Sequence, residues 1–253
     1  QSTVELLNRT QERLATGRRV NSPLDNATNY FVAKSHMDRA EDLSVRKDGM
    51  GEAIQTVKAA NEGITAITEL IASAKGLAQS ALSAGTAERS TLAAQFDAIL
   101  TQIDELAEDS GYKGTNLLGG DALEVKFNED GTNLLTITGF DASSSSVGLD
   151  ITAAAGNWAT DGNINDAVTD LDAALTELRS QAKTLSSNLN IITTRDAFTQ
   201  GMVNVLTEGA TTLTAADTNE EGANMLMLQV RQSLGTTALS LSAQAAQSVL
   251  RLF

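Results

Sequence analysis

Residues 168–192 read VTDLDAALTELRSQAKTLSSNLNII, and their apolar spacing decides the fold class. The apolar side chains recur after alternating steps of three and four residues, at Val168, Leu171, Leu175, Leu178, Ala182, Leu185, Leu189 and Ile192. This spacing places them on one side of a helix, as in the seam of a coiled coil. A helix with such a stripe has to bury it against other helices, so we predict a helical bundle.

The same spacing returns in three other parts of the chain. It runs from Met50 to Ala81, from Leu92 to Leu106, and from Met227 to Leu252. At about 1.5 Å per residue, a helix over residues 163–214 would be roughly 75 Å long, which exceeds the diameter of about 46 Å expected for a compact globule of this size. The predicted fold class is therefore mainly α, an elongated antiparallel coiled-coil or helical-bundle rod.

Between the second and third helical stretches the apolar period changes to two. Residues 123–127 and 135–138 alternate apolar and polar side chains, and Asn128-Glu129-Asp130-Gly131 between them is a turn sequence. This pattern is typical of a β-hairpin. We therefore predict a small β-hairpin-rich insertion at residues 121–160, at the end of the rod far from both termini. The acidic turn lacks the full ligand spacing of an EF-hand loop, so calcium binding is the less favoured interpretation.

Helix starts are marked by polar side chains that cap the first turn. Ser22-Pro23-Leu24-Asp25 combines a capping serine, a first-turn proline and a carboxylate three residues after the cap. Residues 163–166 and 217–220 have similar start signals, and Gly17 marks the end of a first short helix. We therefore expect long helices to begin at these three places.

Composition excludes most kinds of chemistry. The 253 residues contain no cysteine and a single histidine, His36, so no disulfide, zinc–thiolate site or cysteine nucleophile is available. The sequence contains neither the phosphate-loop motif G-x-x-x-x-G-K-[ST] nor the dinucleotide-binding motif G-x-G-x-x-G. We therefore expect no enzyme, no cofactor and no metal site.

The charge is acidic and unevenly distributed. The net charge is -14, while residues 1–60 hold nine basic and eight acidic side chains and are close to neutral. An acidic body repels phosphate backbones, so nucleic acid is excluded as a partner. No stretch approaches 18 consecutive apolar residues, so a membrane span is not expected either.

Both ends of the chain have shallow apolar stripes that two short helices could not cover by themselves. Because isolated helices of about 15 residues are marginal in water, each end needs neighbouring subunits for its burial. When head-to-tail contacts between subunits do not close into a ring, they generate a filament. Arg13 and Arg18 could pair with acidic helices of those neighbours. The predicted self-assembly interface comprises Val4, Leu7, Arg13, Leu14, Arg18, Leu234, Leu241 and Leu252.

Several motifs, in order along the chain, resemble bacterial flagellins. Residues 12–22, ERLATGRRVNS, are similar to the N-terminal flagellin motif, and residues 111–118, GYKGTNLL, are similar to the F-N-G-x-x-L-L turn of the family. Residues 217–224, DTNEEGAN, and the ending VLRLF are also similar. That ending and Asn29-Tyr30-Phe31 indicate the alphaproteobacterial type.

The resemblance implies a structural subunit that polymerises into the extracellular flagellar filament. Residues 1–20 and 217–253 would form an inner terminal coiled-coil domain, with about twenty residues expected ahead of Gln1. Residues 21–120 and 161–216 would form the helical rod domain, and residues 121–160 a small outer insertion. The implied partners are copies of the chain itself, a flagellar export chaperone, the type III export apparatus, the filament cap and the hook–filament junction proteins.

Two surface features also follow from the resemblance. Many flagellins have an R-E-L-A-V-Q stretch that Toll-like receptor 5 reads, but residues 75–80 here are KGLAQS. Loss of the glutamate at Gly76 and of the valine at Gln79 predicts weak or no recognition by this receptor. Flagellins often carry O-linked sugars, and Ser143, Ser144, Ser145 and Ser146 in the insertion are candidate acceptors.

Two alternatives remain open at this point. A hook–filament junction protein has similar ends, although the VLRLF ending and residues 217–224 argue against it. A flagellin-like surface protein that binds polysaccharide would need clustered aromatic side chains in the insertion. The insertion has only Phe127, Phe140 and Trp158.

Overall fold

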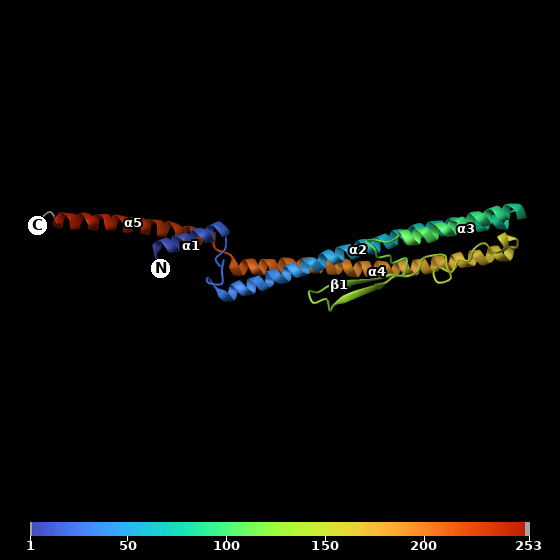
Figure 1. Cartoon of the computed structure of the whole chain (residues 1–253), viewed down its shortest axis with the longest axis horizontal. Helices are drawn as coiled ribbons and strands as arrows, with labels where there is room; N and C mark the ends of the chain where they lie inside the picture. The colour runs from blue at the N-terminus through green and yellow to red at the C-terminus, as the bar shows by residue number, and fades with distance from the viewer. Residues whose placement is uncertain (1, 251–253) are drawn as a thin grey trace. The chain divides into compact units, whose positions relative to one another are not determined.

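The computed structural model describes residues 2–250, and these are mostly helical (Figure 1). The helices are α1 Thr3–Thr16, α2 Ala27–Leu82, α3 Thr86–Asp109, α4 Asp161–Thr214 and α5 Thr218–Leu250, with strands β1 Ala122–Lys126 and β2 Leu134–Thr138 and a short 3₁₀ turn, η1 Ala155–Trp158. The predicted class, long packed helices with one small hairpin, is confirmed.

The chain divides into two compact units. The terminal unit comprises Gln1–Glu41 and Met202–Phe253, and the central unit comprises Asp42–Gly201. The terminal unit therefore contains α1, α5 and the adjoining ends of α2 and α4. The central unit contains α3, the hairpin, η1 and the remaining parts of α2 and α4, and each unit is described separately below.

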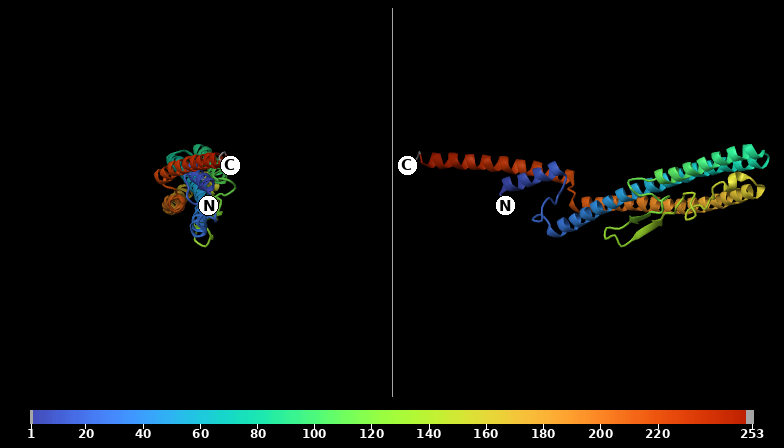
Figure 2. Two further views of the ribbon diagram at one scale, coloured as in Figure 1. Left: turned by 90° about the vertical axis from the view of Figure 1, so that its left-hand side faces the viewer. Right: turned by 45° about the vertical axis from the view of Figure 1, so that its right-hand side comes forward.

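The core of the central unit is the predicted helical seam. In α4, Leu171, Leu178, Leu185 and Ile192 are seven residues apart and are all buried, whereas Val168, Leu175, Ala182 and Leu189 between them are half-buried. They share one core with the seam residues of α2 and with Phe96, Leu100 and Ile103 of α3. Figure 2 shows α3 running back alongside α2. The coiled-coil spacing therefore identified the buried face correctly.

The predicted hairpin is also present. Strands β1 and β2 pair antiparallel with Val125 opposite Leu135 and Leu123 opposite Ile137. Val125 and Ile137 are buried, so the hairpin turns one face toward the core. Gly131, at φ 68°, occupies the left-handed conformation that closes the turn.

The expected position of the hairpin at the far end was wrong. The end of the central unit farthest along α2 is the α2–α3 turn, where the Arg89 guanidinium donates to Asp161 at 2.6 Å. The tip of the hairpin lies instead beside Arg46, whose Nη2 donates to the carbonyl of Glu129 at 3.1 Å. Arg195 of α4 lies 5.2 Å from the centre of the Phe127 ring. The chain after α3 turns back because its apolar side chains, including Leu117 and Leu118, are buried in the same seam.

Helix starts agree with the sequence in only one of three cases. Asp217 caps α5 as predicted, since its Oδ1 accepts from the backbone N–H of Asn219 at 2.9 Å. Helix α4 begins at Asp161, two residues earlier than expected, and its N-cap bond is from the N–H of Asn163 to the hydroxyl of Thr160 at 3.4 Å.

The Ser22 cap was wrong. Ser22 to Asp25 form a β-turn in which the N–H of Asp25 donates to the carbonyl of Ser22 at 3.1 Å, and Pro23 occupies the second position that its fixed φ favours. Helix α2 begins after Asn26, whose Oδ1 accepts from the N–H of Asn29 at 3.0 Å. Asp25 bonds backward to the N–H groups of Asn21 and Ser22, so its carboxylate closes the turn rather than a helix.

A glycine inside α2 allows the end of α3 to approach closely. A Cβ atom placed on Gly63 would lie 2.3 Å from the Ser110 hydroxyl oxygen and 2.6 Å from Cδ1 of Leu118. Gly76, in the same helix, has no atom within 4 Å of the corresponding position. The two glycines therefore separate the effect of packing from that of helix propensity.

We expect Gly63→Ala to lower the free energy of unfolding by about 1–3 kcal/mol, because overpacking outweighs the helix-propensity gain of about 1 kcal/mol. Gly76→Ala should raise it by about 1 kcal/mol, since it gains propensity without a clash. Urea unfolding followed by circular dichroism measures both. Equal stability of the two variants would contradict the proposed close approach.

Candidate self-assembly surface

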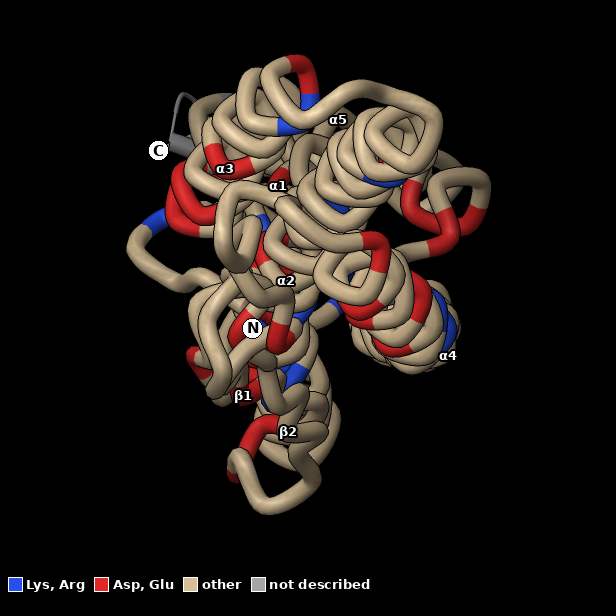
Figure 3. The backbone as a smooth tube through the Cα atoms, turned by 90° about the vertical axis from the view of Figure 1, so that its right-hand side faces the viewer, with Lys and Arg blue, Asp and Glu red and all other residues tan. Residues whose placement is uncertain are grey.

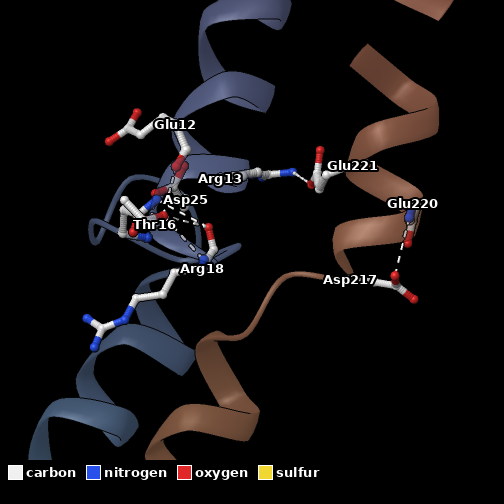
Figure 4. A network of polar contacts seen from close by, with 9 residues as sticks. Glu12, Arg13, Thr16, Arg18, Asp25, Asp217, Glu220 and Glu221 are labelled. Atoms are coloured by element: carbon white, nitrogen blue, oxygen red, sulfur yellow. Dashed lines mark hydrogen bonds and ion pairs between the residues drawn. The ribbon is translucent and has the colours of Figure 1, made fainter. Parts of the chain in front are cut away.

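In the terminal unit, α1 packs against the first half of α5 through a buried ion pair. Nη1 of Arg13 lies 2.8 Å from Oε1 of Glu221, with the Glu221 side chain only 8% exposed and that of Arg13 21% exposed (Figure 4). Thr10 of α1 and Leu228 of α5 are buried in the same unit. Arg13 was predicted to contact a neighbouring subunit, but here it has a partner in its own chain.

Backbone hydrogen bonds join the two connections that adjoin these helices. The N–H of Arg19 donates to the carbonyl of Thr214 at 2.6 Å, and that of Ala216 donates to the carbonyl of Gly17 at 3.0 Å. Gly17 ends α1 in the left-handed conformation, at φ 66°. The ends of α1 and α4 are thereby held together, and they fix where the exposed side chain of Arg18 emerges.

The turn at residues 22–25, between α1 and α2, is stabilised by the Asp25 carboxylate. Its Oδ2 accepts from the backbone N–H groups of Asn21 and Ser22 at 3.1 and 3.0 Å and from the Ser22 hydroxyl at 3.2 Å. Desolvation raises the pKa of Asp25, but these hydrogen bonds and the charge of Arg13 together outweigh it and hold the pKa below its ordinary value. Asp25 is therefore ionised at neutral pH, and its carboxylate closes the turn between α1 and α2.

The second half of α5 is not buried by the rest of the described chain. Every side chain from residue 229 to residue 247 is exposed, including Leu234 at 65% and Leu241 at 61%. Val4 of α1 is also exposed, whereas Leu7 and Leu14 are half-buried against the terminal unit. Leu252 lies outside the described residues. Among the predicted interface residues, Val4, Arg18, Leu234 and Leu241 are therefore open to another molecule.

Sequence reasoning missed part of this surface. Leu226 and Leu239 lie off the three-and-four seam and are among the most exposed leucines of α5. A helix with apolar residues on more than one side is buried by several neighbours. The signal that could have shown this was the presence of leucine on both sides of the seam, rather than along it alone.

The remaining predicted surface residues lie in the central unit. Ser145 and Ser146 are exposed, while Ser143 and Ser144 are half-buried, and the N–H and hydroxyl of Ser144 both donate to Asp104. Residues 75–80 lie on α2, where Lys75 pairs with Asp172 of α4. No helix within residues 2–250 has the length and apolar character needed to cross a membrane.

We expect Arg13→Met to release α1 from α5, because it leaves the Glu221 carboxylate buried without its partner. Breaking a buried pair in this way costs about 3 kcal/mol. Amide hydrogen exchange should then show faster exchange in both α1 and the first turns of α5. Arg9→Met, at an exposed position of the same helix, is the matched control. Unchanged protection of α1 in Arg13→Met would show that the ion pair does not hold it.

Comparison with known proteins finds relatives over the whole chain. A family model described as the bacterial flagellin N-terminal helical region matches residues 1–122. A flagellin of Brucella melitensis is 29% identical over 100% of this chain and 93% of its own length. Flagellin FljO of Caulobacter vibrioides is 27% identical over 100% of this chain and 92% of its own length.

The fold agrees with these relatives. The crystal structure of Bacillus cereus flagellin superposes with a TM-score of 0.53, covering 60% of this chain and 88% of that chain at 17% identity. The two full-length relatives are alphaproteobacterial, which confirms the type indicated by the ending and by Asn29-Tyr30-Phe31. The chain therefore belongs to the flagellins, the filament subunits of the bacterial flagellum.

Proposed function

We propose that this flagellin polymerises through the exposed second half of α5 together with the exposed face of α1. The observation that supports the proposal is the run of exposed side chains from residue 229 to residue 247, which contains Leu234, Leu239 and Leu241. Fully burying one leucine contributes about 1.5–3 kcal/mol, so covering these three by neighbouring subunits would supply a large part of the assembly free energy.

As a flagellin, the chain is a structural and non-enzymatic protein of the extracellular flagellar filament. We propose the following arrangement within it. Residues 1–20 and 217–253 form the inner domain, residues 21–120 and 161–216 form the surrounding tube, and residues 121–160 face outward.

The exposed leucines of α5 also require shielding before assembly. This requirement supports binding by an export chaperone before the chain passes through the type III export apparatus. The filament cap and the hook–filament junction proteins complete the proposed set of partners.

The polysaccharide-binding alternative is not favoured. Sugar binding would need exposed aromatic rings in the insertion, but Trp158 and Phe127 are buried and Phe140 is half-buried. The junction-protein alternative is not favoured either, because the relatives that span this chain are flagellins.

We expect the double variant Leu234→Ser/Leu241→Ser to abolish filament growth. The isolated subunit should remain folded, because both side chains are already exposed in it. Growth is measured by electron microscopy of the full-length chain added to short filament seeds, and folding by circular dichroism. Val147→Ser is the matched control, because Val147 is exposed at 85% but lies in the serine loop of the central unit. Normal growth of the double variant would refute the proposed surface.

We also propose weak or no recognition by Toll-like receptor 5. The position of the missing glutamate, Gly76, is exposed on α2, and Lys75 beside it is engaged by Asp172. Loss of a charged contact at the centre of an interface costs a few kcal/mol, or about two orders of magnitude in affinity.

Reporter cells that express the receptor should therefore respond weakly to the purified monomer. Gly76→Glu combined with Gln79→Val should raise the response, because it restores the two missing side chains at exposed positions. Activation of the reporter by nanomolar unmodified protein would contradict this proposal.

O-linked sugars are proposed on the serine loop. Ser145 and Ser146 are the better acceptors because they are exposed, whereas the Ser144 hydroxyl is bonded to Asp104 at 3.1 Å. The mass of the peptide that contains residues 127–179 of filaments from the native bacterium tests this assignment. An unmodified mass would rule it out.

A further inference from the structure

The two units differ strongly in charge. The central unit holds ten basic and 23 acidic side chains, whereas the terminal unit holds eight basic and nine acidic ones. In Figure 3 the backbone is coloured by residue type, with Asp and Glu in red and Lys and Arg in blue. Central units packed against one another in a filament would repel, so favourable contacts between copies require basic groups from elsewhere. The terminal unit is close to neutral, so its unpaired basic side chains can meet the acidic central unit of another copy with less repulsion.

The end of α3 concentrates negative charge where a helix tolerates it least. Asp104, Glu105, Glu108 and Asp109 occupy its last two turns, and its last turn has no basic residue. The C-terminus of a helix already has a negative partial charge, so these carboxylates destabilise it unless a cation covers them. Glu108 and Asp109 are exposed, and neither side chain has a hydrogen bond or ion pair within the described chain.

The terminal unit has a groove with the complementary character. A cavity of about 360 Å³ lies between the first turns of α2 and the last turns of α4, lined among others by Arg18, Tyr30 and Met37. Lys34 and Asp38 also line it and pair with each other at 3.2 Å, so Arg18 leaves the groove with an excess positive charge. Within residues 2–250, no carboxylate lies within ion-pair distance of the Arg18 guanidinium. Figure 4 shows this side chain pointing away from the Arg13–Glu221 pair.

The Arg18 groove and the residues next to it in the sequence have the composition of an interface centre. Phe31, which follows the lining residue Tyr30, is 60% exposed, and the two rings meet edge to face at 5.5 Å between centroids. Leu24, in the adjoining turn, is 97% exposed. Arginine, tyrosine, phenylalanine and methionine are the residues enriched at the centres of protein interfaces. The groove therefore combines an unpaired cation with an apolar wall.

We propose that the Arg18 groove receives the acidic end of α3 from a second copy of this chain. Carboxylates of Glu108 and Asp109 would accept hydrogen bonds from the guanidinium of Arg18. The contact neutralises the unfavourable charge at the end of α3 and gives the repelling central units a basic partner. It rests on the proposed polymerisation and names one contact within it.

Charge reversal on each side tests the contact. Arg18→Glu alone places like charges opposite one another, as does Glu108→Arg with Asp109→Arg. We expect each variant to grow from seeds at least about tenfold more slowly than the unmodified chain, with a smaller defect at high salt. An equimolar mixture of the two variants should grow at close to the normal rate, because alternating copies restore opposite charges in every contact.

The controls separate this contact from polymerisation in general and from net charge. Arg179→Glu makes the same charge change at an exposed site of α4 and should grow normally. Circular dichroism verifies that each variant is folded. If the unmodified chain itself fails to grow from seeds, the proposed function fails. If it grows but the two variants grow normally, or remain slow when mixed, the assignment of the acidic end of α3 to the Arg18 groove is wrong.

Discussion

Burial of the apolar seam of α2, α3 and α4 is the constraint on which the rest of this molecule depends. A helix whose apolar residues recur every three or four positions cannot stand alone in water, and most helical stability in proteins comes from packing of such a face. In α2 the inner face includes Ala60, Ala74, Ala78 and Ala81, all fully buried. Small side chains and Gly63 allow neighbouring backbones to approach, and the larger Leu and Ile side chains of α4 and α3 fill the remaining space.

The insertion is attached to this seam by the only tryptophan. Trp158 is fully buried against Phe96, with ring centroids 4.9 Å apart, although its backbone has φ 55° and follows two other left-handed residues. Such a conformation costs about 1–3 kcal/mol per residue. Burying an aromatic side chain of 150–250 Å² contributes about 4–6 kcal/mol, so packing outweighs the strain at Trp158 itself. The chain therefore accepts an unusual turn in order to begin α4 beside the core.

We propose that the terminal helices follow the same rule between molecules, by burying their apolar side chains against neighbouring subunits. In the central unit, the seam is buried within one chain, whereas the side chains of α5 from residue 229 to residue 247 are exposed. In the proposed assembly, neighbouring subunits bury the exposed leucines of α5, so the subunit folds by itself and keeps an apolar surface for polymerisation. Within the single chain, the ion pair of Arg13 with Glu221 holds α1 against α5, so this contact does not depend on a neighbouring subunit.

The sequence by itself determined the helices, the buried seam of the central unit, the hairpin and the family. These features depend on spacing within about ten residues, because side-chain direction follows the local backbone period. Only the tertiary structure decided that Arg13 pairs with Glu221, since 208 positions separate them and many carboxylates were equally available. It also decided that Asp25 closes a turn and that the hairpin folds back toward Arg46 and Arg195. Such choices depend on which groups the packed helices bring together, and a periodic pattern holds no information about that.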